Sequence, residues 1–209
     1  MAAIAEYFSG LPWLELIAML LALAYVILAA RGSLWCWPAA FISTALYTVI
    51  FYDVQLLMDS ALSIYYLVMA VYGYWVWKNN HPQANIQATG ITVISLPTAW
   101  HFKVCTGLTV LAFTLGYLMA TYTPASFPYL DTFTTVFAVF ATYLVTQKVL
   151  ENWLYWLVID LVSIYLYLEK GLIPTAVLFV LYVIIAAYGY IKWQGLYRNS
   201  QSHLQTVNG

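Results

Sequence analysis

Residues 72–77 read YGYWVW and residues 188–193 read YGYIKW, so one pattern returns after 116 residues. Two further pairs of aromatic residues keep this offset: Trp37 with Trp153, and Tyr66 with Tyr182. One such motif can recur by chance, but three matches at a single offset indicate a duplication. We therefore predict that the chain contains one helical unit twice.

The composition predicts a membrane protein. Of 209 residues, 64% are hydrophobic and only 7% are charged, against roughly a quarter charged in an ordinary soluble domain. A surface with so few charges needs lipid around most of it. The seven basic residues are scattered, which excludes the basic patches of a nucleic-acid binder. Cys36 and Cys105 have no metal-ligand spacing, so we expect no metal site and no disulfide.

Apolar runs between polar breaks predict seven transmembrane helices, because a span needs about 20 mostly apolar residues. The predicted helices cover residues 13–30, 32–52, 55–77, 103–122, 131–148, 150–168 and 172–193. Lys and Arg concentrate in cytoplasmic loops, and an outside N-terminus puts six of the seven basic residues inside. The sequence thus predicts an all-α membrane protein with the N-terminus outside and the C-terminus inside.

The repeat divides this single transmembrane domain, residues 1–209, into parts. We expect a first three-helix unit at 13–77, a cytoplasmic linker at 78–102, a linking helix at 103–122, a second three-helix unit at 131–193 and a disordered cytoplasmic tail at 194–209. The two three-helix units are parallel repeats in this topology, and such repeats typically enclose a substrate path near the membrane midplane. A duplicated structural or enzymatic bundle without a path is the alternative.

Asp160 carries the clearest functional signal, because an ionisable group at a helix centre in the membrane costs about 2.5–3.5 kcal/mol. Steps of three and four residues put it on one helix face with Trp153, Trp156, Ser163 and Tyr167. Ring faces attract cations and a carboxylate neutralises them, so this face predicts a site for an organic cation. A structural role for Asp160, as a hydrogen-bond partner of another helix, is the alternative.

Polar and aromatic side chains of the first three-helix unit could line the other side of the path: Trp37, Thr44, Thr48, Asp59, Ser63 and Tyr66. Other aromatic residues at the predicted cytoplasmic helix ends are expected to anchor the protein at the membrane interface: Tyr74, Trp75, Trp77, Tyr190 and Trp193. Gly73, Gly116 and Gly189 are expected to permit close helix packing.

Sequence patterns for catalysis are lacking. The chain contains no GxSxG, no HExxH and no P-loop. Its three histidines, His81, His101 and His203, fall in the predicted linker or tail. We therefore expect neither an enzyme nor a cofactor.

Several motifs resemble the PnuC family of bacterial vitamin transporters: ENWLYW at 151–156, the two YGY motifs with their closing tryptophans, and Trp37 and Tyr66 in the first half. The resemblance covers the whole membrane region. It implies a 3+1+3 helix arrangement like that of the SWEET sugar carriers, in a homotrimer of the bacterial inner (cytoplasmic) membrane. It also implies facilitated diffusion of an unphosphorylated vitamin by alternating access, with trapping by a cytoplasmic vitamin kinase.

The family includes carriers of nicotinamide riboside, thiamine and riboflavin. Nicotinamide riboside carriers tend to place amides along the path, whereas the matching positions here hold Ser43, Ser63, Asp160 and Tyr188. A carboxylate among aromatic rings suits thiamine, which we predict first, with nicotinamide riboside as the alternative and a non-transporting membrane scaffold as a remote one. The residues predicted to bind the substrate are Trp37, Ser43, Thr44, Tyr47, Asp59, Ser63, Tyr66, Asn152, Trp153, Trp156, Asp160, Ser163, Tyr182 and Tyr188.

Overall fold

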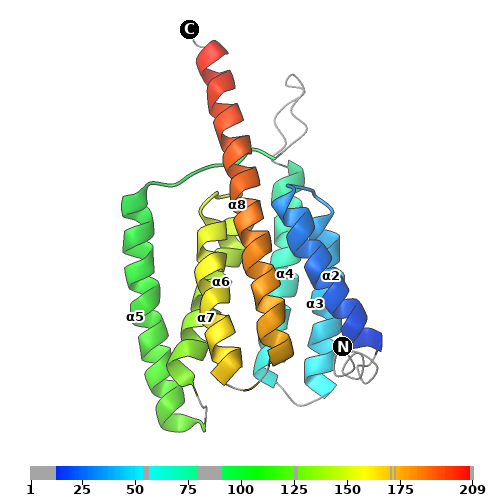
Figure 1. Ribbon diagram of the computed structural model, residues 1–209, viewed down its shortest axis with the longest axis vertical. Helices are drawn as coiled ribbons and strands as arrows, with labels where there is room; N and C mark the ends of the chain where they lie inside the picture. Colours follow the sequence, from blue (N-terminus) through cyan, green and yellow to red (C-terminus); the bar gives the residue numbers. More distant parts are fainter. Residues whose placement is uncertain are drawn as a thin grey trace. The chain divides into compact units, whose positions relative to one another are not determined.

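The computed structural model describes residues 13–53, 57–79, 91–124, 127–169, 171 and 173–207. They form seven helices (Figure 1): α2 (Trp13–Ala30), α3 (Cys36–Asp53), α4 (Leu57–Asn79), α5 (Thr98–Tyr122), α6 (Pro128–Thr146), α7 (Asn152–Glu169) and α8 (Ile173–Val207). The described residues contain no strand, only an isolated bridge between Ile94 and Val149. An all-α chain of seven helices is thus confirmed, and each helix begins within five residues of its predicted start.

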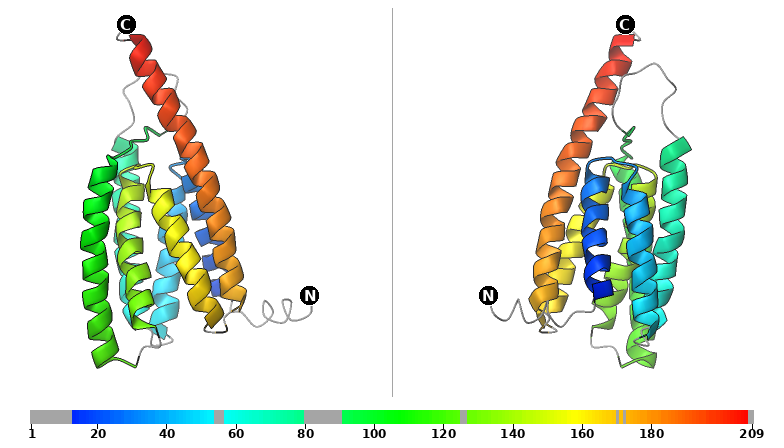
Figure 2. Two further views of the ribbon diagram at one scale, coloured as in Figure 1. Left: turned by 60° about the vertical axis from the view of Figure 1, so that its left-hand side comes forward. Right: turned by 90° about the vertical axis from the view of Figure 1, so that its right-hand side faces the viewer.

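The helices group into two compact units. Unit 1, Met1–Asn80, contains α2 to α4, and unit 2, His81–Gly209, contains α5 to α8. In unit 1, α3 packs against α2 and α4. In unit 2, α6 packs against α5 and α7, and α7 also packs against α8. Figure 2 shows the neighbours within each unit from two further sides, and the predicted linking helix, α5, packs within unit 2.

The turn from α2 to α3 has the same backbone geometry as the turn from α6 to α7. Gly32 (φ 69°) and Lys148 (φ 58°) both have left-handed conformations, and they are 116 residues apart. Matching backbone hydrogen bonds close the two turns: Ser33 N to Leu28 O at 2.9 Å, and Val149 N to Leu144 O at 3.1 Å. A left-handed residue ends a helix in this way by satisfying its last carbonyl groups. The predicted duplication therefore extends to the backbone of this turn.

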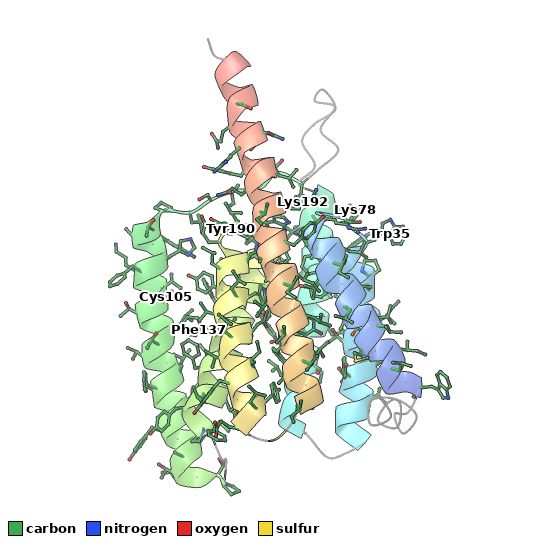
Figure 3. All side chains as sticks on the ribbon, viewed as in Figure 1. Trp35, Lys78, Cys105, Phe137, Tyr190 and Lys192 are labelled. Carbon is green, nitrogen blue, oxygen red and sulfur yellow. The ribbon has the colours of Figure 1, made fainter. Side chains whose placement is uncertain are left out.

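The core of unit 2 lies where α5, α6 and α7 meet. Phe137 and Leu144 on α6 are buried together with Tyr155 and Ile159 on α7, and Cys105 on α5 packs against them. Figure 3 labels Phe137 and Cys105. Burying a large apolar side chain stabilises a fold by about 1.5–3 kcal/mol. This cluster therefore holds α7, the helix that carries Asp160, firmly against its neighbours in unit 2.

Large apolar side chains cover much of the surface. On α5, Phe102, Phe113 and Tyr117 are 75%, 61% and 62% exposed. Three helical segments of the described chain are long and apolar enough to cross a membrane: Thr98–Tyr122, Pro128–Thr146 and Thr175–Ser202. Exposed apolar surface on this scale is expected of a protein surrounded by lipid.

The last helix is longer than predicted. α8 runs for 35 residues to Val207, so the prediction of a disordered tail from residue 194 is wrong as far as Val207. No proline interrupts residues 194–207, and proline is the residue that most strongly breaks a helix. At 1.5 Å per residue α8 is about 52 Å long, which exceeds the roughly 30 Å of bilayer hydrocarbon. Its polar C-terminal turns are therefore expected to project beyond the membrane.

Candidate functional site

Each unit contains a tryptophan packed face-on against a glycine. In unit 1, the ring of Trp37 on α3 comes within 2.3 Å of where a Cβ at Gly73 would lie. Trp77 closes the arrangement edge-on, with ring centroids 5.4 Å apart and an interplanar angle of 89°. Glycine is required here because any side chain at Gly73 would overlap the indole. We call this arrangement the Trp–Gly–Trp packing.

Unit 2 repeats the Trp–Gly–Trp packing with the residues at the 116-residue offset. The ring of Trp153 on α7 comes within 2.7 Å of where a Cβ at Gly189 would lie. The ring of Trp193 lies edge-on to that of Trp153, with ring centroids 5.5 Å apart and an interplanar angle of 88°. The sequence repeat is therefore a repeat of contacts within each unit. The prediction that Gly73 and Gly189 permit close helix packing is confirmed.

The structure corrects the prediction that Trp77 and Trp193 anchor at the membrane interface. Their side chains are 1% and 0% exposed, because both belong to the Trp–Gly–Trp packing. Trp75, in contrast, is 61% exposed, as expected for an interfacial anchor. The signal that distinguishes them is present in the sequence: a tryptophan four residues after a glycine lies one helical turn away on the same face.

Trp37 and Trp153, both predicted to contact substrate, are only 2% exposed. Within the described residues, the Nε1 atom of each indole is buried and has no hydrogen-bond partner. A buried donor without a partner costs about 1–3 kcal/mol. Their contact with substrate stays a prediction, and packing is the role that the geometry assigns to their rings.

Asp160 is buried in the middle of α7. Its side chain is 3% exposed, and it lies about 12 Å along a helix of 18 residues. Among the described residues no hydrogen bond or ion pair to its carboxyl group is found. Ser163, one turn further along the same face, is 5% exposed. The predicted carboxylate face is thus enclosed by the protein, and the charge of Asp160 has no protein counter-ion there.

Aromatic rings pack together on α7 and α8 of unit 2. The ring centroid of Phe179 on α8 lies 5.1 Å from that of Tyr167, which is on the Asp160 face of α7. Tyr182, a predicted binding residue, lies edge-on to Phe179 at 5.6 Å. Trp156 packs instead against the core of unit 2. These contacts bring aromatic side chains of both helices together two turns beyond the acid.

Two other predicted residues of unit 2 have different surroundings. Asn152, the first residue of α7, is fully buried, and its Nδ2 donates to Val149 O at 2.6 Å. Its side-chain oxygen has no partner in the described part of the chain. Tyr188 is 40% exposed, and Lys192 Nζ lies 5.7 Å from the centre of its ring. Asn152 therefore supports the start of α7, whereas Tyr188 lies at the surface.

The predicted residues of unit 1 have mixed roles. Ser43 is buried and its hydroxyl donates to Ala18 O on α2 at 2.7 Å, so it links α3 to α2. Ser63 is buried on α4. The ring centroid of Tyr66 lies 5.5 Å from that of Tyr65. Thr44 and Tyr47 are half-buried on α3. The side chain of Asp59 lies outside the described residues, so its place in the site stays a prediction.

Unit 2 contains a polar cluster that was not predicted from the sequence. It joins the segment before α5 to the start of α7, and its members are Ser95, His101, Cys105, Glu151 and Tyr155. No spacing pattern links residues about 50 positions apart in sequence. The one local hint is the four-residue step from His101 to Cys105, which puts both on one face of α5. No group of three or more His, Cys, Asp or Glu side chains in the described part of the chain could hold a metal ion.

The chain is similar to known vitamin transporters along most of its length. The profile of the family described as nicotinamide mononucleotide transporter matches residues 12–195. The nicotinamide riboside transporter PnuC of Escherichia coli (strain K12) is 24% identical, and the match covers 88% of this chain and 85% of that protein. The riboflavin/roseoflavin transporter RibM of Streptomyces davaonensis is 25% identical, with 87% and 84% covered.

A solved structure shares the fold. The crystal structure of the vitamin B3 transporter PnuC matches with a TM-score of 0.76 and 21% sequence identity, covering 94% of this chain and 87% of that one. Together with the apolar helices, these similarities make the chain a multi-pass membrane protein and a vitamin transporter rather than an enzyme. Since the family profile spans nearly the whole chain, the protein belongs to the nicotinamide mononucleotide transporter family, which includes the PnuC-type vitamin transporters.

Proposed function

We propose that the protein carries a positively charged vitamin across the membrane, and that this vitamin is nicotinamide riboside. The proposal rests first on its relatives, since PnuC proteins of Escherichia coli and Neisseria mucosa are named nicotinamide riboside transporters. It replaces thiamine, the first choice from sequence, as the leading substrate. Both molecules carry a permanent positive charge on an aromatic ring, so the charge argument from Asp160 applies to each.

The observation that carries the proposal is the isolation of Asp160. A buried carboxylate without a partner is costly in a protein and more so in a membrane, where an acid at a helix centre costs about 2.5–3.5 kcal/mol. Asp160 is buried, and no counter-ion faces it among the described residues. A cationic substrate would supply the missing charge, which supports a role for Asp160 in binding.

The aromatic rings near this face support the same class of substrate. Tyr167, Phe179 and Tyr182 pack in sequence from α7 to α8. A cation over the face of such a ring gains about 0.5–1 kcal/mol when exposed and about 2 kcal/mol when desolvated. We infer that the ring of the vitamin lies against these side chains while Asp160 balances its charge.

The remaining features of transport are inferred from the family resemblance. We propose facilitated diffusion by alternating access, with trapping by a cytoplasmic vitamin kinase, in a homotrimer of the bacterial inner membrane. The distribution of Lys and Arg supports the orientation with the N-terminus outside. The matched turns and the repeated Trp–Gly–Trp packing support a 3+1+3, SWEET-like arrangement of parallel repeats.

Thiamine is the second candidate, and the chemistry of the Asp160 face favours it. Besides Asp160, the polar groups on or near this face are the hydroxyls of Ser163, Tyr167 and Tyr182 and the indole N–H groups of Trp153 and Trp156. Asn152 is the amide among the predicted unit 2 residues, and its Nδ2 is engaged by Val149 O. The carboxamide of nicotinamide riboside would therefore find hydroxyl and indole partners rather than amides, whereas the thiazolium charge of thiamine is met by the carboxylate and the rings.

Isothermal titration of the detergent-purified protein tests both candidates. We expect nicotinamide riboside to bind more tightly than thiamine, and riboflavin, which is neutral, to bind weakly. Asp160→Asn should weaken the binding of either cation at least about tenfold, which equals about 1.4 kcal/mol. Tighter binding of thiamine would reverse the order of the candidates. Unchanged cation binding in Asp160→Asn would overturn the role of the carboxylate.

A further inference from the structure

A short segment before α5 lies on the turn between α6 and α7. We call residues 91–97 the strap. The Ile94 N–H group donates to Lys148 O at 3.0 Å, and the Leu150 N–H group donates to Ile94 O at 2.8 Å. Val93 is 2% exposed. Backbone hydrogen bonds and apolar burial thus bind the strap to unit 2.

Glu151, at the start of α7, fastens the strap further. Its carboxylate accepts a hydrogen bond from the Ser95 hydroxyl and another from the Leu96 N–H group at 3.3 Å. Nε2 of His101, in the first turn of α5, lies 3.6 Å from the same carboxylate. One acidic side chain therefore holds the strap, α5 and α7 together.

His101 lies between two residues of the α7 region. Its Nδ1 is 2.9 Å from the Tyr155 hydroxyl, whereas its Nε2, facing Glu151, is buried without a hydrogen-bond partner in the described residues. Cys105 Sγ shares the Tyr155 hydroxyl at 3.4 Å, and the Trp100 ring packs edge-on at 5.0 Å. The titratable groups around the imidazole are thus Glu151, Tyr155 and Cys105.

The neighbouring basic side chains leave Glu151 as the charged partner of His101. Lys103 on α5 is exposed, and Lys148 is the charged residue of the adjacent turn, where its carbonyl holds the strap. A protonated imidazole would donate from both nitrogens, to Tyr155 and to Glu151. A neutral imidazole can still present its one N–H group to Glu151 while Nδ1 accepts from the Tyr155 hydroxyl, but it carries no charge. Protonation adds a positive charge 3.6 Å from the carboxylate, so the strength of the contact with Glu151 depends on the charge of His101.

We propose that the strap is a pH-sensitive latch on unit 2, closed by the contact between His101 and Glu151. Histidine is the side chain that ordinarily changes charge within the physiological pH range. In acid, the charged ring holds the Glu151 carboxylate against Ser95 and Leu96, and the strap stays bound. At higher pH the ion pair is lost and the strap is held by its hydrogen bonds alone.

The latch sets how much chain connects the helices of the two units. Residues 80–90 separate α4 from the strap in sequence. Release of the strap adds its seven residues to this connection, at most about 25 Å of extended chain. A longer connection permits larger relative movement, so the closed latch would restrain alternating access. This consequence rests on the proposed transport function, whereas the latch itself does not.

Hydrogen–deuterium exchange of the full-length protein tests the latch without any substrate. Peptides that contain the Ile94 and Leu150 amides are followed at about pH 6 and about pH 8, after correction for intrinsic exchange rates. We expect exchange to be about two- to fivefold slower in acid, as a partly exposed ion pair would produce. His101→Gln should abolish this difference, and His203→Gln, a control histidine on α8, should retain it.

Two outcomes would overturn the latch: equal corrected exchange at both pH values in the natural protein, or an undiminished difference in His101→Gln. Glu151→Gln provides the same test should His101→Gln not fold, because loss of the carboxylate must also remove the pH difference. Failure of vitamin binding in a protein whose strap responds to pH would contradict the proposed function and leave the latch intact.

Discussion

The indole of Trp153 occupies the space that a side chain at Gly189 would need, with ring atoms 2.7 Å from the position of the absent Cβ. Trp37 stands in the same relation to Gly73 in unit 1, at 2.3 Å. In both units the obstacle is a rigid buried ring rather than the end of a flexible side chain. The contact between α7 and α8, like that between α3 and α4, therefore depends on the absence of one methyl group.

Gly189→Ala and Gly73→Ala should each destabilise the protein. An added methyl in a filled core costs about 1–3 kcal/mol, because the surrounding side chains must leave their preferred rotamers. Thermal unfolding in detergent measures the effect as a lower melting temperature. Gly195→Ala on α8 and Gly107→Ala on α5 are matched controls, since no heavy atom lies within 4 Å of either added Cβ. Equal melting temperatures for all four variants would contradict the packing.

Trp77→Ala should be far more damaging than Trp75→Ala, although the two residues are neighbours in sequence. Trp77 is 1% exposed and Trp75 is 61% exposed. Truncation of a buried tryptophan costs about 3–5 kcal/mol, whereas an exposed one contributes little to folding. The yield and melting temperature of the purified variants measure the difference. Comparable losses would show that Trp77 is not part of the core of unit 1.

The ring of Tyr182 should matter more for substrate binding than its hydroxyl group. Tyr182→Phe keeps a ring in contact with Phe179, and we expect its affinity for a cationic vitamin to stay within about threefold of the natural value. Tyr182→Leu removes the ring and should weaken binding about five- to tenfold, the loss of a cation–π contact of about 1 kcal/mol or more. Titration calorimetry measures both. A larger loss in Tyr182→Phe would assign the contribution to the hydroxyl group.

Gly32→Ala should lower stability for a backbone reason. Its φ of 69° lies in the left-handed region, which costs a residue with a Cβ about 1–2 kcal/mol. Denaturation of the variant should show a loss of this order, and Gly107→Ala, inside α5, should show none. An unchanged stability would mean that the turn after α2 relaxes to another conformation.

Lys148 should make stability depend on pH in the alkaline range. Burial lowers the pKa of this side chain, so the folded protein gives up the proton more readily than the unfolded chain does. Stability then rises as pH increases from the folded pKa towards the unfolded pKa of about 10.4, because deprotonation removes the cost of a buried charge. Melting temperatures measured from about pH 8 to pH 10 should rise less in Lys148→Met than in the natural protein.

The sequence predicted the helices well, because hydrophobic run length is a local property that lipid imposes on every span. It also located the repeat through residues such as Trp37 and Trp153. It assigned Trp77 and Trp193 to the surface because composition alone treats every tryptophan near a helix end as an anchor. The four-residue step from Gly73 or Gly189 puts each of them on the face of the glycine, but their burial also requires Trp37 or Trp153 of the neighbouring helix to pack there.

Sequence patterns did not predict the strap or the length of α8, for a different reason. The hydrogen bonds between Ile94 and Lys148, and between Ser95 and Glu151, join segments more than 50 residues apart. Contacts between such distant segments leave no periodic pattern in the sequence. The end of α8 is polar and therefore resembles a disordered tail, although it contains no proline to stop the helix.

The matched turns after α2 and α6 are two copies of one backbone structure within the same molecule. The same backbone conformation is occupied by Gly32 in one copy and by Lys148 in the other, and in unit 2 the strap lies over it. Placing the same residue type at position 32 and at position 148 therefore compares one side chain in two turns of one protein. With the side chain and the backbone conformation equal, any difference between the two turns comes from their surroundings, a comparison that ordinarily requires two homologous proteins.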